Sequence, residues 1–210
     1  MRKLLLVLLG AASTIIVNAQ TFTIDTISDA IFHRMQGKSY KAGCKIPRSE
    51  LRYLQLSYYD ATGKEHIGEI VCNKLIANDL VKIFKELHKH QYPIERMQLV
   101  DDYDADDEVS MSNNNTSCFN YRTIAGSTKL SKHAMGLAID INPLYNPYVR
   151  RKKDGNYIVQ PANARKYINR EKAWPYKIEL GDLCYRLFVK YGFKWGGSWS
   201  HFQDYQHFER

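Results

Sequence analysis

Cysteine is scarce in this sequence, and so are long apolar stretches. Its 210 residues include four cysteines, and no two of them are close enough for a Cys-x-x-Cys metal or redox motif. After the first twenty residues, no run is long and apolar enough to span a bilayer. Internal repeats and low-complexity linkers are also missing. These absences exclude a repeat array and favour one domain of about 190 residues.

The first twenty residues, "MRKLLLVLLGAASTIIVNAQ", differ from the rest. Arg2 and Lys3 precede an apolar run, and Val17-Asn18-Ala19 resembles a small-residue cleavage site. We therefore expect residues 1–19 to be a signal peptide and the mature chain to begin near Gln20. The protein would then be exported, to the periplasm or outside the cell, with no stable membrane insertion after cleavage.

Export would expose the four cysteines to an oxidising compartment; they are Cys44, Cys72, Cys118 and Cys184. In an oxidising compartment, an even number favours one or two disulfides, and four cysteines allow three complete pairings. Four buried thiols are the alternative, and the sequence does not decide between them.

Positive charge is in excess. The formal net charge is +8, and removal of Arg2 and Lys3 would leave +6. Basic runs such as "RRKK" at 150–153 are commonly solvated loops, but they can also attract an anionic partner. Nothing in the sequence resembles a nucleic-acid-binding module. For an exported protein, an acidic cell-wall polymer is the more natural partner.

Apolar periodicity and turn signals predict intermixed helices and strands. The N-terminal part of the domain, residues 20–110, would contain a helix, a hairpin and a second, amphipathic helix. Leu75, Leu80, Ile83, Phe84 and Leu87 recur at helical spacing in that second helix. The expected elements are a helix at 27–36, a hairpin at 51–60 and 66–73, a helix at 75–90, a strand at 94–103, a polar acidic loop at 104–116, a strand at 136–142 and a helix at 177–192.

Regular strand–helix–strand alternation is lacking, so the expected class is α+β. We expect a single compact domain with a small antiparallel sheet flanked by helices.

The stretch "SKHAMGLAID" at 131–140 places a histidine and an aspartate among small and apolar residues. If "GLAIDIN" is a strand, the apolar residues Leu137, Ile139 and Ile141 point to one face and Asp140 points to the other. Gly136 and Ala138 would then leave room beside Asp140 for something to bind. A histidine, His133, precedes the strand and could approach Asp140. Carboxylate and imidazole suit Zn²⁺, although an Asp–His pair that only stabilises a turn remains the alternative.

A catalytic zinc usually has three protein ligands, so a third should lie elsewhere. The C-terminal "WSHFQDYQHFER" offers His201 and His207, with Asp204 and Glu209 nearby. A water-activating site also needs a general base that is not a ligand. Asp204 and His207 are three positions apart, so they can face one site only if the chain bends between them.

Two motifs carry a family resemblance. "SKHAMGLAID" fits the pattern S-x-H-x-x-G-x-A-x-D, and "DYQHFE" fits a D-x-x-H close. Together they resemble the peptidase M15 family of zinc D-alanyl-D-alanine carboxypeptidases, dipeptidases and L-alanyl-D-glutamate endopeptidases. The resemblance runs from about Asn113 to the C-terminus, and we expect residues 111–210 to be the catalytic region.

The resemblance implies three zinc ligands, His133, Asp140 and His207. We expect the zinc site in a cleft on the small antiparallel sheet. The resemblance also implies that Asp204 takes a proton from the attacking water and that Arg122, in "FNYR", polarises the scissile carbonyl. An ordinary surface arginine is the alternative for Arg122.

Four further residues have weaker assignments. Ser131 matches the motif serine, which would contact substrate or brace the loop. His201 has no counterpart in the pattern, and Glu209 would support His207. The tryptophans of "KWGGSW", Trp195 and Trp199, could wall a substrate groove or simply pack in the core.

The implied function is hydrolysis of an amide bond in the stem peptide of peptidoglycan, by a monomer that uses Zn²⁺. The aspartate of the D-x-x-H close resembles the endopeptidase branch, since the carboxypeptidase and dipeptidase branch has E-x-x-H. Cleavage between L-alanine and D-glutamate is therefore expected. The alternatives are a D-alanyl-D-alanine carboxypeptidase, a non-catalytic zinc-fold protein that binds the cell wall, and a purely structural envelope protein.

Overall fold

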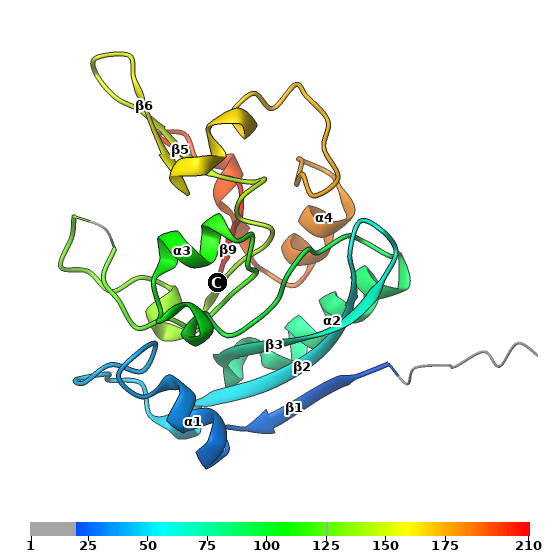
Figure 1. The fold of residues 1–210 in the computed structure, drawn as a ribbon, viewed down its shortest axis with the longest axis vertical. Helices are drawn as coiled ribbons and strands as arrows, with labels where there is room; N and C mark the ends of the chain where they lie inside the picture. The colour runs from blue at the N-terminus through cyan, green and yellow to red at the C-terminus, as the bar shows by residue number, and fades with distance from the viewer. Residues whose placement is uncertain (1–19, 125) are drawn as a thin grey trace, which may run out of the picture.

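A three-stranded antiparallel sheet forms the base of the structure, a computed structural model that describes residues 20–124 and 126–210. Its strands are β1 (Phe22–Thr26), β2 (Leu51–Tyr59) and β3 (Glu65–Asn73), in that order across the sheet (Figure 1). The predicted hairpin is confirmed, with Leu51 paired to Asn73 and Tyr59 to Glu65. Strand β1 was not expected. The proposed signal peptide, residues 1–19, lies outside the described residues.

Helix α2 (Lys74–Lys89) covers one face of this sheet, as its periodicity predicts (Figure 1). Asn73 caps it, because the Asn73 side chain accepts a hydrogen bond from the Leu75 backbone N–H. One of the five expected core positions is wrong: Leu75 is 64% exposed. It precedes Leu80 by five residues, which turns it about 140° around the helix from the buried side.

A second apolar cluster lies at the start of the chain. Helix α1 (Asp29–Met35) packs Met35 against Leu51, Val71 and Phe119. The predicted helix at 27–36 is thus confirmed within two residues at its beginning. A short 3-10 helix, η1 (Arg48–Glu50), leads from this region into β2.

The segment at 94–116 differs from its prediction. No strand forms at 94–103, where an extended stretch ends in a 3-10 helix, η2 (Val100–Tyr103). One backbone hydrogen bond, from the Glu69 N–H to the Met97 carbonyl, joins this stretch to β3, so the two do not form a regular β-ladder. The acidic segment that follows is not all loop. It contains helix α3 (Asp107–Ser112), which begins because the Asp106 carboxylate accepts from the Val109 N–H.

Two further small antiparallel sheets are built from the C-terminal half. One has the order β4 (Ala138–Asp140), β9 (His207–Glu209), β7 (Lys194–Trp195). The other has the order β6 (Tyr157–Gln160), β5 (Tyr148–Arg151), β8 (Gln203–Asp204). The α+β class is therefore confirmed, with three small sheets in the described residues. The β5–β6 hairpin projects from the body (Figure 1).

The remaining helices are short. They are the 3-10 helices η3 (His133–Met135), η4 (Ala162–Tyr167) and η5 (Gly196–Ser198), and the α-helix α4 (Leu183–Lys190). The helix expected at 177–192 begins only at Leu183, because Asp182 is its N-cap and Gly181, at φ 84°, is not helical. It ends close to the predicted stop at Gly192.

One hydrophobic core joins the two halves of the chain. Leu80 and Phe84 of α2, Ile139 of β4, Phe208 of β9 and Phe188 of α4 belong to the same buried cluster. The strand that carries Asp140 is therefore fixed against the helix that covers the first sheet.

Gly136 does not leave room for a bound group, contrary to the expectation. A Cβ at this position would lie 2.7 Å from the Asn73 backbone nitrogen, and the residue has φ +65°. Its carbonyl accepts from the Asn73 N–H at 2.9 Å. Ala138 is also fully buried. Glycine is needed here because the turn before β4 meets the end of β3.

All four cysteines are free thiols, so of the two alternatives the structure has the free thiols and not the disulfides. Cys72, Cys118 and Cys184 are buried and Cys44 is half-buried. No helix in the described residues has the length and apolarity that a membrane crossing requires.

Candidate metal centre

Strand pairing brings the first two candidate ligands together. In the β4–β9 pair, Asp140 lies directly opposite His207, so both side chains leave the same face of the sheet. Asp140 Oδ1 lies 3.0 Å from His207 Nδ1. Both residues are buried. The β4–β9 pair therefore brings together two residues that are 67 positions apart in the sequence.

His133 approaches from the turn before β4. It begins η3, where the Ser131 hydroxyl accepts a hydrogen bond from the His133 backbone N–H at 3.2 Å. Its Nε2 lies 3.3 Å from Asp140 Oδ1 and 3.2 Å from His207 Nδ1. His133, Asp140 and His207 thus form a buried group that could hold a metal ion.

The outer nitrogens of the two imidazoles face groups that can only accept. His133 Nδ1 lies 2.7 Å from the Cys118 carbonyl oxygen, and His207 Nε2 lies 3.2 Å from the Glu209 carboxylate. Each outer nitrogen therefore carries its ring's hydrogen and donates it.

This assignment leaves three acceptors facing one another. With neutral rings, His133 Nε2 and His207 Nδ1 both present lone pairs, and Asp140 Oδ1 adds a third acceptor within 3.3 Å of each. Such an arrangement is unfavourable unless a cation, either a metal ion or a proton on His207, shares the lone pairs. Two imidazole nitrogens and a carboxylate oxygen, with the outer N–H groups held, are a donor set typical of a zinc site.

The titration behaviour agrees with a site for positive charge. Burial opposes protonation of His207, but hydrogen bonds to Asp140 and Glu209 outweigh it and raise the pKa of His207 to about 10. Burial also opposes ionisation of Asp140, yet the charges of His133 and His207 hold its pKa well below the usual range. The hydrogen bond from His207 lowers the pKa of Glu209, which keeps it an acceptor.

Asp204 faces the same region from the neighbouring sheet. It ends β8, a turn at Tyr205–Gln206 follows, and β9 begins at His207, so the chain bends as the site requires. Burial raises the pKa of Asp204 to about 6, while the charge of His207 lowers it and that of Asp140 raises it. Asp204 is not in the group of potential ligands, although it senses their charges.

The bend depends on a glycine in the adjacent loop. A Cβ on Gly196 would lie 2.7 Å from the Asp204 carbonyl oxygen and 3.3 Å from the Cβ of His207. Any larger residue would force the η5 loop away from the turn between β8 and β9.

The two tryptophans of this segment differ in position. Trp195 is buried, donates its indole N–H to the Tyr205 carbonyl and stacks on Phe208, so it is a core residue. Core packing was the alternative to a substrate-groove role that the sequence left open for Trp195. Trp199 is half-buried, with its ring centroid 5.5 Å from that of His207.

The other predicted residues lie around the cluster or away from it. Arg122 forms an ion pair with Asp107 of α3 and accepts, at its backbone carbonyl, from the Ser131 N–H. Ser131 is buried, which favours its bracing role. His201 is exposed and does not belong to the His133 group. The Cys118 carbonyl was missed, because a backbone acceptor leaves no signal in the sequence.

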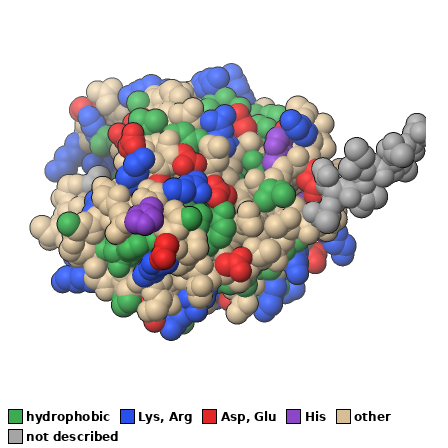
Figure 2. Space-filling view, turned by 60° about the horizontal axis from the view of Figure 1, so that its bottom comes forward, with side chains coloured by type: hydrophobic (Ala, Val, Ile, Leu, Met, Phe, Trp, Pro, Cys, Tyr) green, Lys and Arg blue, Asp and Glu red, His purple; other side chains and the backbone are tan. Residues whose placement is uncertain are grey.

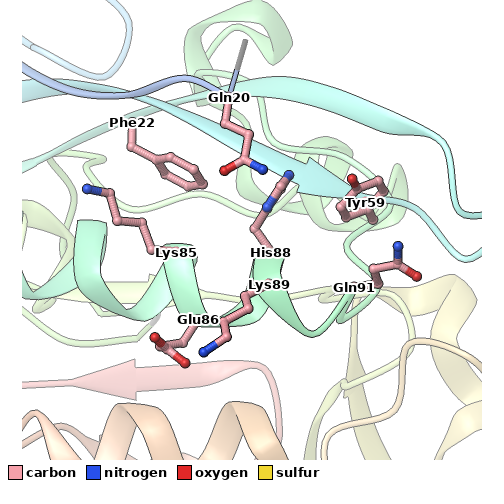
Figure 3. A pocket seen from close by; sticks show the side chains of 8 residues that line it. All are labelled: Gln20, Phe22, Tyr59, Lys85, Glu86, His88, Lys89 and Gln91. Atoms are coloured by element: carbon pink, nitrogen blue, oxygen red, sulfur yellow. The ribbon is translucent and has the colours of Figure 1, made fainter. Parts of the chain in front are cut away.

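A cavity of about 570 Å³ lies elsewhere, between β1, the end of β2 and the C-terminal half of α2 (Figure 3). Phe22, Tyr59 and His88 line it, with Lys85 and Lys89 at its side. None of the candidate site residues borders it. On the face drawn in Figure 2, Lys and Arg side chains are scattered among acidic ones.

One comparison with known proteins, the scan against family models, agrees with this site. Residues 125–210 match a family model of the M15 peptidases that is described as D-alanyl-D-alanine carboxypeptidase. This match, called the M15 region below, covers 86 of the 210 residues. The match contains the three potential ligands and Asp204, and it begins after Arg122. No curated protein and no solved structure matches the chain.

We predict that substitutions within the M15 region separate ligands from neighbours. His133→Ala or His207→Ala should lose most bound zinc, because each removes one of three donors, while His201→Ala should retain one ion per chain. Metal analysis after dialysis, with circular dichroism to verify folding, measures this. Full retention of zinc by folded His207→Ala would exclude His207 as a ligand.

Proposed function

We propose that the protein is a zinc peptidase that hydrolyses an amide bond in the stem peptide of peptidoglycan. The observation that carries this proposal is the convergence of His133 Nε2, His207 Nδ1 and Asp140 Oδ1, whose lone pairs need a cation between them. The M15 match to the same residues supports the peptidase assignment. A metal ion held by these atoms supplies Lewis acidity, which polarises a carbonyl and lowers the pKa of a bound water.

In this proposal, the chain's residues provide positioning and proton transfer. Glu209 and the Cys118 carbonyl hold the two imidazoles in the tautomers that turn their lone pairs inward. Asp204 accepts the proton of the attacking water and then gives it to the leaving amine. Its position at the end of β8, close to the ligands but not among them, suits a general base.

Arg122 has a less direct place in the proposal. Its ion pair with Asp107 fixes the guanidinium on the α3 side, and its backbone holds Ser131 at the start of the His133 turn. Stabilisation of the oxyanion by Arg122 remains the proposed role. It requires the guanidinium to bind substrate while paired, or to exchange Asp107 for substrate.

The choice of bond rests on different observations. The D-x-x-H close, with Asp204 in place of glutamate, resembles the endopeptidase branch and favours cleavage between L-alanine and D-glutamate. The description of the matched family favours release of terminal D-alanine. We propose the endopeptidase activity and keep the carboxypeptidase as the second candidate. Export of the protein, with residues 1–19 as signal peptide, is part of the proposal.

Asp204→Ala should separate chemistry from metal binding. Because Asp204 is proposed to transfer a proton and not to touch zinc, the variant should keep its metal and lose at least about 10²-fold in kcat. Zinc content and the initial rate of stem-peptide hydrolysis are measured on the same preparation. Loss of metal from the correctly folded variant would make Asp204 a ligand instead.

Digestion of intact muropeptides identifies the bond. We expect a released peptide that begins with D-glutamate, detected by mass spectrometry of the digest. Release of free D-alanine alone would contradict the endopeptidase assignment and favour the carboxypeptidase, with the zinc chemistry unchanged. The metal-depleted protein is the control, and it should release neither product.

A further inference from the structure

The sheet that carries Asp204 presents a second set of side chains on the same face. Strand β5 pairs with β8 so that Tyr148 lies directly opposite Asp204 and Val149 opposite Gln203. Directly opposed residues place their side chains on one face, and successive residues alternate. Tyr148 and Arg150 therefore project on the face of Asp204, whereas Val149 and Arg151 project on the other.

The surroundings of Tyr148 agree with this placement. Burial raises the pKa of the Tyr148 phenol, the positive charge of Arg150 lowers it and the negative charge of Asp204 raises it. Both charged groups thus act on the same phenol. On the opposite face Val149 is buried, as the alternation requires.

A row of aromatic rings connects this face with the metal centre. The rings of Tyr148 and Phe202 have centroids 5.2 Å apart, as do those of Phe202 and Trp199. Trp199 in turn lies 5.5 Å from the ring of His207. The four rings lead from β5 to the proposed ligands. Each of Tyr148, Phe202 and Trp199 is half-buried, so part of each residue remains accessible.

The two candidate substrates share one feature beside the bond that breaks. A carboxypeptidase releases free D-alanine, which carries a carboxylate next to its new amine. D-glutamate in a stem peptide continues through its side-chain carboxyl, so its α-carboxylate is also free and also next to the new amine. Either reaction therefore places an anion close to Asp204, the residue proposed to protonate that amine. A carboxylate there needs a cation, and Asp204 itself would repel it.

We propose that Arg150 binds the α-carboxylate of the leaving amino acid, with Tyr148 and Phe202 as the apolar floor on which that residue lies. Arg150 is exposed and projects from the strand that pairs with Asp204. Its guanidinium can form a bidentate pair with a carboxylate. This inference rests on the proposed function and names a specificity-determining residue for it.

The hairpin supplies its own control. Arg151 follows Arg150 on β5, is exposed and carries the same charge, but it projects on the opposite face. Arg150→Gln and Arg151→Gln thus change the net charge equally. Only the first removes a cation from the face of Asp204.

Binding is measured by calorimetry on zinc-loaded Asp204→Ala protein, so that no turnover is required. The probes are a stem pentapeptide that ends in D-alanyl-D-alanine and has free carboxylates, and two singly amidated forms, one at the D-glutamate α-carboxylate and one at the terminal D-alanine. Adding Arg150→Gln should raise the Kd of the free peptide about tenfold or more, and Arg151→Gln should leave it unchanged. In steady-state assays of otherwise wild-type protein, Arg150→Gln should raise KM far more than it lowers kcat.

The amidated peptides identify the carboxylate. Amidation at D-glutamate should weaken binding to the parent protein and abolish the effect of Arg150→Gln, as expected for the endopeptidase. The same pattern upon amidation of the terminal D-alanine would assign Arg150 to the carboxypeptidase. Equal losses from Arg150→Gln and Arg151→Gln, or no loss from either, would overturn the inference and leave the proposed function intact. If the parent protein bound none of the three peptides, the proposed substrate class itself would be wrong.

Discussion

The pairing of Asp140 with His207 across β4 and β9 is the interaction on which the candidate site depends. It places a carboxylate oxygen 3.0 Å from an imidazole nitrogen in a buried position, and His133 adds a second nitrogen within 3.3 Å of the carboxylate. Isolated polar atoms are costly to bury, and three acceptors turned toward one another are costlier. The arrangement becomes favourable when a cation shares their lone pairs, and the outer contacts of both rings are arranged for that case.

The rest of the fold holds this arrangement in place. Phe208 and Ile139 alternate with the site residues on β9 and β4 and are fully buried in the main core. Gly136 allows the turn that carries His133 to meet the end of β3, and its carbonyl bonds the Asn73 N–H. A short β4–β9 pair is therefore kept in register by a much larger hydrophobic cluster. The same cluster includes α2, so the N-terminal half supports a site to which it gives no ligand.

The sequence predicted the elements whose signals are local. The hairpin of β2 and β3, helix α2 and the alternation around Asp140 all follow from apolar periodicity. The strand expected at 94–103 did not form, because its hydrogen bonds go to scattered partners and not to a neighbouring strand. Leu75 was misplaced because helical spacing alone does not show where the packed face ends.

The candidate site was predicted unevenly for similar reasons. Motif resemblance predicts His133, Asp140 and His207 as ligands, and their meeting requires a strand pair that spacing does not reveal. The Cys118 carbonyl was missed because it is backbone. No pattern in the sequence associates Arg150 with Asp204, since only the pairing of β5 with β8 places them on one face.

X-ray absorption spectroscopy of the zinc-loaded protein tests the His133–Asp140–His207 centre directly, because it reports the atoms bound to the metal. We predict one zinc per chain with two imidazole nitrogens and a carboxylate oxygen at about 2.0–2.2 Å, and no sulfur at about 2.3 Å. The chain has four free thiols that could compete for the metal. A spectrum dominated by sulfur, or a folded protein that retains no zinc, would contradict the proposed His133–Asp140–His207 centre.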